Sequence, residues 1–193
     1  MKLAIVKYNA GNIQSVLYAL ERIGMEAVVT DDHALLRSAD KVIFPGVGEA
    51  SSAMHYLKER QLDSLIKNLE QPVLGICLGM QLMCRHSEEN NTDCLGIFDT
   101  TVKRFSGGLK IPQIGWNLVQ ETREPLFSHL PKEAYCYFVH SYYAALCDET
   151  SATTEYGVRF SSALQKGNFY GVQFHPEKSA AVGEQILKNF IHL

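Results

Sequence analysis

The chain has 193 residues, of which 46% are hydrophobic and 20% are charged, and its formal net charge is -3. These values predict one globular domain over residues 1–193, with no basic surplus that would indicate a nucleic-acid partner. No apolar run approaches the roughly 20 residues that cross a membrane, and the run 1–6 is too short for a signal peptide. We therefore expect a cytoplasmic protein with no membrane partner. Five cysteines without a C-x-x-C pair predict reduced thiols and no metal site.

The first half of the chain alternates between strand-like and helix-like segments. Apolar runs predict strands at 3–6, 26–29 and 41–44. After the turn 8–12, helical spacing of apolar residues predicts a helix, and the same spacing predicts helices over 50–60 and 62–69. This order predicts an α/β fold of flavodoxin-like type, with a central, mostly parallel sheet flanked by helices. In such sheets ligands bind at the carboxyl ends of the strands.

The third predicted strand ends in the turn Pro45-Gly46-Val47-Gly48. Two glycines around one valine allow N–H groups to turn inward or a peptide to flip, so we interpret the Val47 N–H as an oxyanion donor. An ordinary tight turn is the alternative. A dinucleotide-binding loop is disfavoured because Ser51 occupies the third glycine position of G-x-G-x-x-G.

The segment 72–83 carries the strongest signal. A buried strand over 73–76 passes at Cys77 into a helical pattern, and Gly75 and Gly79 flank the cysteine. This G-x-C-x-G spacing is typical of a nucleophile elbow, a strained turn that lifts the nucleophile above the sheet. We expect the glycines to leave room for the turn and the substrate, and the Leu78 N–H to be an oxyanion donor. A cysteine at a helix N-terminus favours the reactive thiolate, whereas an inert core cysteine is the alternative.

Gln81 follows Cys77 by four positions, so both side chains share one helix face and the amide is placed to hold a polar substrate. Beyond it, residues 87–93 predict a solvated polar loop. Strand-like segments then replace the alternating pattern and predict a strand-rich C-terminal half, at 95–98, 102–105, 116–119, 134–145 and 168–174. By composition alone the single tryptophan, Trp116, is assigned to the core.

The last of these strands leads into His175-Pro176-Glu177. A nucleophilic thiol needs a base, and the base needs a group that fixes its tautomer, so we assign these roles to His175 and Glu177. Pro176 stiffens the turn between them. His140, inside its predicted strand, is the weaker alternative base. The predicted chemistry is acyl transfer from a carboxamide or ester through a thioester.

The motifs at 75–81 and 171–177 resemble those of the triad, or class I, glutamine amidotransferases. Further motifs are similar to those of the glutaminase subunits of imidazole glycerol phosphate synthase, at 8–12, 45–48, 112–117 and 137–142. The resemblance implies that Cys77, His175 and Glu177 hydrolyse glutamine to glutamate and ammonia without a cofactor. It also implies a heterodimer, in which a (β/α)8-barrel cyclase subunit uses the ammonia to make imidazole glycerol phosphate and aminoimidazole carboxamide ribotide in histidine biosynthesis.

The resemblance also implies roles for residues outside the triad. It assigns glutamine binding to Gly48, Gln81, Ser141 and Tyr142. It places four residues toward the partner subunit, namely Asn12, Trp116, Tyr137 and Lys178. A peptide flip in the turn 46–48 on docking of the partner would explain low activity of the isolated subunit.

Three alternatives remain open at this stage. The first is a paralogous glutaminase subunit that supplies ammonia to a synthase of surface-sugar or pyridoxal phosphate biosynthesis. The pyridoxal phosphate type usually has G-G-E-S where this chain has Gly46-Val47-Gly48-Glu49. The second is a non-catalytic binding module of the same fold, and the third is a cysteine peptidase or related hydrolase with an elbow cysteine.

Overall fold

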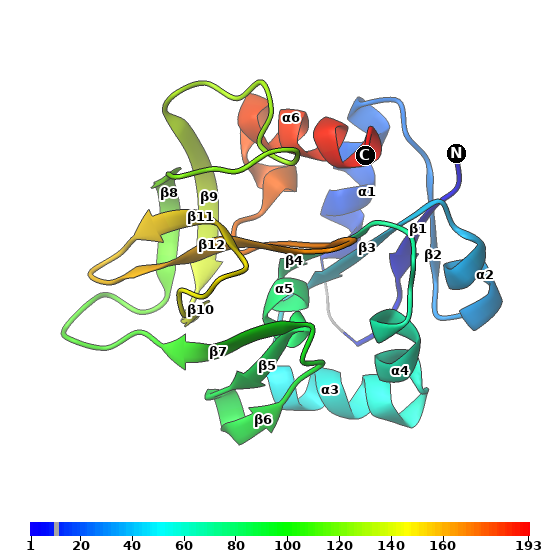
Figure 1. Ribbon diagram of the computed structural model, residues 1–193, viewed down its shortest axis with the longest axis horizontal. Coiled ribbons are helices and arrows are strands. Elements are labelled where there is room, and N and C mark those ends of the chain that lie inside the picture. The colour runs from blue at the N-terminus through cyan, green and yellow to red at the C-terminus, as the bar shows by residue number, and fades with distance from the viewer. Residues whose placement is uncertain (10–11) are drawn as a thin grey trace.

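The computed structural model describes residues 1–9 and 12–193, so residues 10 and 11 of the predicted turn 8–12 lie outside the described part. The main sheet has the strand order β2-β1-β3-β4-β13-β12-β10-β7-β5-β6, with β11 paired to β12 (Figure 1). Its strands are β1 (Leu3–Val6), β2 (Ala27–Thr30), β3 (Lys41–Gly46), β4 (Val73–Cys77), β5 (Cys84–Ser87), β6 (Thr92–Asp93), β7 (Phe98–Arg104), β10 (Tyr142–Ala144), β11 (Thr150–Glu155), β12 (Arg159–Lys166) and β13 (Phe169–Val172). A separate antiparallel pair contains β8 (Gln113–Val119) and β9 (Ala134–His140).

Helices cover both faces of the sheet (Figure 1). They are α1 (Ile13–Arg22), α2 (His33–Ser38), α3 (Ala50–Glu59), α4 (Leu62–Lys67), α5 (Leu78–Met83) and α6 (Ala180–Ile191), with short 3-10 helices η1 (Glu89–Asn91) and η2 (Pro176–Lys178). Alternate residues of each buried strand serve the two faces, as strand geometry requires. On β1, Ala4 and Val6 pack in the core beneath α3 and α4, while Leu3 and Ile5 pack in the core with α1 and α6.

The predicted parallel α/β sheet is confirmed for the central strands, where β2, β1, β3, β4 and β13 run parallel. The strand predicted at 95–98 is wrong, because Gly96 has a φ of +71° and β7 starts only at Phe98. The N–H groups of 95–97 bind instead to carbonyl oxygens of Leu82, Met83 and Cys84 at the end of α5.

The single strand predicted over 134–145 is two strands in two sheets. β9 pairs with β8 up to His140, and β10 starts at Tyr142 and pairs with β7 and β12. The chain therefore changes sheets at Ser141, close to the carboxyl end of the parallel strands. This change of sheet brings the segment 139–142 to the edge where the site is formed.

Three neighbouring parallel strands bring the predicted site residues to that edge. In the register of the sheet, Gly46 at the end of β3 is opposite Cys77 at the end of β4, and Val172 of β13 is opposite Ile76 of β4. The turn 46–48, the elbow cysteine and His175 therefore leave adjacent strand ends. Among the helices of the described chain, none is long and apolar enough to cross a membrane.

Candidate active site

Cys77 lies in a strained turn between β4 and α5. Its φ of 53° and ψ of -109° fall outside the regions that L residues favour, as in a nucleophile elbow. A Cβ atom at Gly75 would collide with the backbone of Met80, and one at Gly79 would overlap the carbonyl oxygen of Phe44. The glycines therefore allow α5 to pack closely on β3 and β4. The sequence also predicted that these glycines make room for the substrate. The atoms that a side chain at either position would meet belong instead to the protein.

His175 and Glu177 form a buried pair next to the elbow. Nδ1 of His175 lies 2.8 Å from Oε1 of Glu177, and both side chains are almost completely buried. The same carboxylate oxygen accepts a hydrogen bond from Nδ2 of Asn12 at 3.2 Å. Asn12 therefore lies beside the predicted triad, where its side chain helps to orient Glu177.

The charge of His175 depends on its two neighbours. Burial disfavours the charged imidazole, but interactions with Cys77 and then with Glu177 outweigh it and raise the pKa of His175 to about 10. Nε2 of His175 is buried and has no hydrogen-bond partner among the residues that the structure describes. The arrangement favours an imidazolium beside the sulfur.

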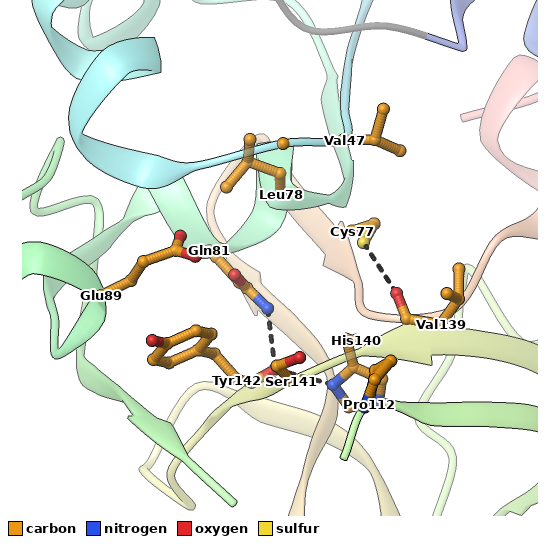
Figure 2. Close-up of a pocket in the computed structure, with 11 residues that line it drawn as sticks. Val47, Cys77, Leu78, Gln81, Glu89, Pro112, Val139, His140, Ser141 and Tyr142 are labelled. Carbon is orange, nitrogen blue, oxygen red and sulfur yellow. Dashed lines mark hydrogen bonds between the residues drawn. The ribbon is translucent and has the colours of Figure 1, made fainter.

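A cavity of about 300 Å³ opens above the cysteine and brings all four predicted substrate-binding residues together (Figure 2). It is lined by residues from five parts of the chain, namely Val47, Gly48, Cys77, Leu78, Gln81, Glu89, Pro112, Val139, His140, Ser141 and Tyr142. Cavities of this size suit a small polar molecule. Val47 and Leu78, the predicted oxyanion donors, line the same cavity as Cys77.

The hydrogen bonds of Gln81 restrict what it can offer to a ligand. Its Nε2 donates to the carbonyl oxygen of Tyr142 at 2.9 Å (Figure 2) and to Oε1 of Gln173 at 2.8 Å. These two bonds use both N–H groups of the amide. Gln81 can therefore bind a ligand only as an acceptor, through Oε1.

Glu89 is a site residue that the sequence reasoning missed, because we predicted residues 87–93 to be solvated. Instead Ser87 and Thr92 are buried, and Glu89 lines the cavity. Its Oε2 accepts a hydrogen bond from the N–H of Ala50 at 2.8 Å. Burial raises the pKa of Glu89, that N–H opposes the rise, and repulsion from Glu49 adds to it. No local pattern indicated this role, because it depends on a contact with the start of α3.

His140 lines the cavity but is not suited to be the base. Its Nδ1 lies 2.7 Å from the carbonyl oxygen of Tyr142, and its Nε2 lies 3.0 Å from Oε1 of Gln113. Burial lowers its pKa to about 4, which exceeds the opposite effect of the bond to Tyr142. His140 is therefore neutral near pH 7 and holds the segment that carries Ser141 and Tyr142.

The turn after β3 is held from beneath by Tyr8. The hydroxyl of Tyr8 donates to the carbonyl oxygen of Pro45 at 2.7 Å, and it occupies the space that a side chain at position 46 would need. Gly48 has a φ of +119°, a conformation that favours glycine. The second glycine of the turn is therefore required by its backbone, whereas Gly46 is required by packing.

The other residues predicted to face a partner lie on the outside of β8, β9 and η2. Trp116 is 53% exposed, so its assignment to the core is wrong. Its ring meets that of Tyr137 edge-on at 6.1 Å, and the ammonium of Lys178 lies 6.0 Å from the centre of the Tyr137 ring. Trp116 sits on a strand of a two-stranded pair that has one face open, which explains why composition assigned it wrongly.

Comparison with known families identifies the class of protein. The family model described as glutamine amidotransferase class-I matches residues 4–193. The chain therefore belongs to the class I glutamine amidotransferase family.

Relatives within that family share one name. A protein of Bacteroides thetaiotaomicron named imidazole glycerol phosphate synthase subunit HisH is 60% identical over 196 residues, covering 100% of both chains. A protein of the same name from Shewanella sediminis is 48% identical and covers 98% of this chain and 89% of its own. A solved structure described as a glutamine amidotransferase superimposes with a TM-score of 0.76 at 17% identity, covering 98% of this chain and 97% of the other, which supports the fold alone.

Proposed function

We propose that this chain is the glutaminase subunit of an imidazole glycerol phosphate synthase in histidine biosynthesis. In this proposal residues 1–193 form one glutamine amidotransferase domain that hydrolyses glutamine to glutamate and ammonia. The observation that carries it is the 2.8 Å contact between His175 and Glu177, placed at a strand end next to the elbow that holds Cys77. The full-length identity of 60% to a HisH subunit supports this function over that of other amidotransferases.

The reaction follows from the groups around the sulfur. The Cys77 thiolate attacks the carboxamide carbon of glutamine, and the N–H groups of Val47 and Leu78 stabilise the oxyanion. Nε2 of His175 gives its proton to the leaving nitrogen, and ammonia departs from a glutamyl thioester. The same nitrogen then takes a proton from water, which attacks the thioester and releases glutamate. Glu177 and Asn12 hold the imidazole in the required orientation.

The lining of the cavity supports the proposed binding of glutamine. Glu89 and Oε1 of Gln81 are hydrogen-bond acceptors, which suits the α-ammonium group of the substrate. Gly48, Ser141 and Tyr142 line the remaining wall and bind the rest of the amino acid. We infer that the two ends of the cavity fix the carboxamide carbon above Cys77.

A second subunit is required to consume the ammonia. We propose a cyclase subunit with a (β/α)8 barrel, which docks on the face formed by Trp116, Tyr137 and Lys178. An exposed tryptophan beside a second aromatic ring is typical of the centre of a protein interface. The five free cysteines agree with a reducing, cytoplasmic location.

One experiment tests both parts of the proposal. Glutamate release is measured for the chain alone, with the cyclase subunit, and with the cyclase subunit and its nucleotide substrate. We expect the complete mixture to be fastest, and Cys77→Ala to abolish glutamate release while synthesis from free ammonium continues. Stimulation by a surface-sugar or pyridoxal phosphate synthase instead would contradict the choice of partner. Glutamate release by Cys77→Ala would contradict the mechanism.

A further inference from the structure

Gln173 is a buried polar residue to which the mechanism above gives no role. It follows β13, is 0% exposed, and is held by a backbone hydrogen bond from its N–H to the carbonyl oxygen of Ser162 at 2.9 Å. It precedes His175 by two positions. Both residues are directed toward the elbow, since the amide of Gln173 contacts Cys77 and His175 interacts with the same cysteine.

The side chain of Gln173 completes a chain of hydrogen bonds that ends on the nucleophile. The chain starts at the carbonyl oxygen of Tyr142, which accepts from Nε2 of Gln81. Gln81 also donates to Oε1 of Gln173 at 2.8 Å, and Nε2 of Gln173 lies 3.6 Å from Sγ of Cys77. Hydrogen bonds to sulfur are longer than those to oxygen, so this contact is a donor–acceptor contact.

The direction of these hydrogen bonds is fixed by the first acceptor, which is the carbonyl oxygen of Tyr142. The two ends of a glutamine amide are usually assigned from their partners. A backbone carbonyl oxygen can only accept, so the Gln81 atom beside Tyr142 must be nitrogen. The Gln173 atom that faces this nitrogen must then be oxygen. The amide nitrogen of Gln173 is therefore left facing the sulfur of Cys77, and it can only donate.

We propose that Gln173 is a further catalytic residue, whose amide N–H donates to Sγ of Cys77 and stabilises the thiolate. The proposal rests on the proposed glutaminase function, since it concerns the nucleophile of that reaction. A hydrogen bond to an ionised acceptor is about twice as strong as one to a neutral group, so it favours the thiolate over the thiol. The carbonyl oxygen of Val139, 4.0 Å from the sulfur, has the opposite effect because it accepts from a thiol and repels a thiolate.

The same series of hydrogen bonds joins the substrate cavity to the nucleophile. Gln81 lines the cavity through one part of its amide and orients Gln173 through another. Any change that displaces Gln81 or the Tyr142 carbonyl should therefore leave Gln173 free to rotate. The sulfur would then lose its donor although neither residue touches it.

The test measures ionisation of Cys77 directly, without substrate. The rate of alkylation by iodoacetamide is followed against pH, with the modified Cys77 peptide quantified by mass spectrometry. In Gln173→Met, which has similar size but neither donor nor charge, we expect the midpoint of the pH profile to rise by about one to two units. Gln173→Glu keeps the oxygen that accepts from Gln81 and should also raise the midpoint. Gln81→Met, which keeps Gln173 but removes the amide that orients it, should raise it by less.

The matched controls are Gln165→Met and Gln165→Glu on the neighbouring strand β12, which should keep the wild-type midpoint. Circular dichroism establishes which variants are folded. If neither Gln173 variant is folded, the midpoint measured for Gln81→Met decides the outcome. Other titratable groups that face the cysteine are left unchanged in all variants, namely Tyr8, Glu89, His140, His175 and Glu177.

A wild-type midpoint in folded Gln173→Met, or a rise confined to Gln173→Glu, overturns the role of Gln173. If only Gln81→Met is folded, an unchanged midpoint in that variant overturns it. These outcomes leave the proposed function intact. That function fails on a separate result, the absence of glutamate release from the wild-type chain in the presence of the cyclase subunit.

Discussion

Gly79 of α5 lies directly against the backbone carbonyl group of Phe44 on β3, so that a Cβ atom at position 79 would overlap the carbonyl oxygen. The contact brings the elbow helix close to the strand that carries the oxyanion turn. Both elements are fixed relative to each other by backbone, which cannot move aside as a flexible side chain can. The geometry of the site therefore depends on a residue that has no side chain and no role in the chemistry.

We expect Gly79→Ala to destabilise the fold by about 3 kcal/mol, because the added methyl group forces the helix away from the strand. Thermal unfolding checks this. The matched control is Gly108→Ala, where φ is +78° and a Cβ atom meets no other atom. It should cost about 1 kcal/mol, from backbone conformation alone. Equal losses in both variants would show that the overlap at Phe44 is relieved without cost.

Glu177→Gln should lower kcat for glutamine hydrolysis by about 100-fold or more, because the neutral amide no longer stabilises the imidazolium. Glu177 is one of the two groups that raise the pKa of His175 to about 10. Its loss should therefore move the titration midpoint of His175 down, as followed by NMR of the imidazole. Glu184→Gln, a change of the same kind on the surface of α6, should alter neither quantity. An unchanged midpoint in Glu177→Gln would remove the carboxylate from the triad.

Glu89→Gln should raise KM for glutamine by about 10- to 100-fold with a smaller effect on kcat, because an ionic hydrogen bond to the α-ammonium group is lost. Since burial raises the pKa of Glu89, the wild-type carboxylate takes up its proton at a higher pH than an ordinary glutamate does. KM of the wild type should then rise as the pH falls, and Glu89→Gln should lack this rise. Steady-state kinetics of the complex from pH 5 to 8 measure both. If KM is the same in both proteins, Glu89 does not bind the substrate.

His140→Gln should make the free energy of unfolding depend less steeply on pH between about pH 4 and 6.5. Burial lowers the pKa of His140 to about 4 from its usual 6.5, so the unfolded chain binds the proton first as the pH falls. The contribution of neutral His140 to the free energy of unfolding is complete above about pH 6.5, and it is lost as the pH falls to 4. It amounts to about 3 kcal/mol in the free energy of unfolding. Urea titrations across this range measure the slope, which His55→Gln, at an exposed histidine of α3, should leave unchanged. A wild-type slope in His140→Gln would mean that another group is responsible.

The sequence by itself predicted the chemistry and determined the central fold. The strand-to-helix turn at Cys77 and the His175-Pro176-Glu177 motif are local patterns, and alternating strands and helices predict a parallel sheet. Parallel strands end at one edge, so these patterns also predicted that the cysteine and the histidine would meet. The structure places them at neighbouring strand ends, β4 and β13.

Only the tertiary structure decided which polar groups complete the site. Glu89 approaches the cavity because η1 packs against the start of α3, and Gln173 faces the sulfur because β13 lies beside β4. Gln81 has both N–H groups occupied by residues more than 60 positions away. Trp116 is exposed because its face of the β8–β9 pair is open, and Ile114 on the same face is exposed as well. Spacing along a chain fixes local backbone conformation, but the partners of a side chain depend on which distant segments pack beside it, and this is decided when the whole core forms.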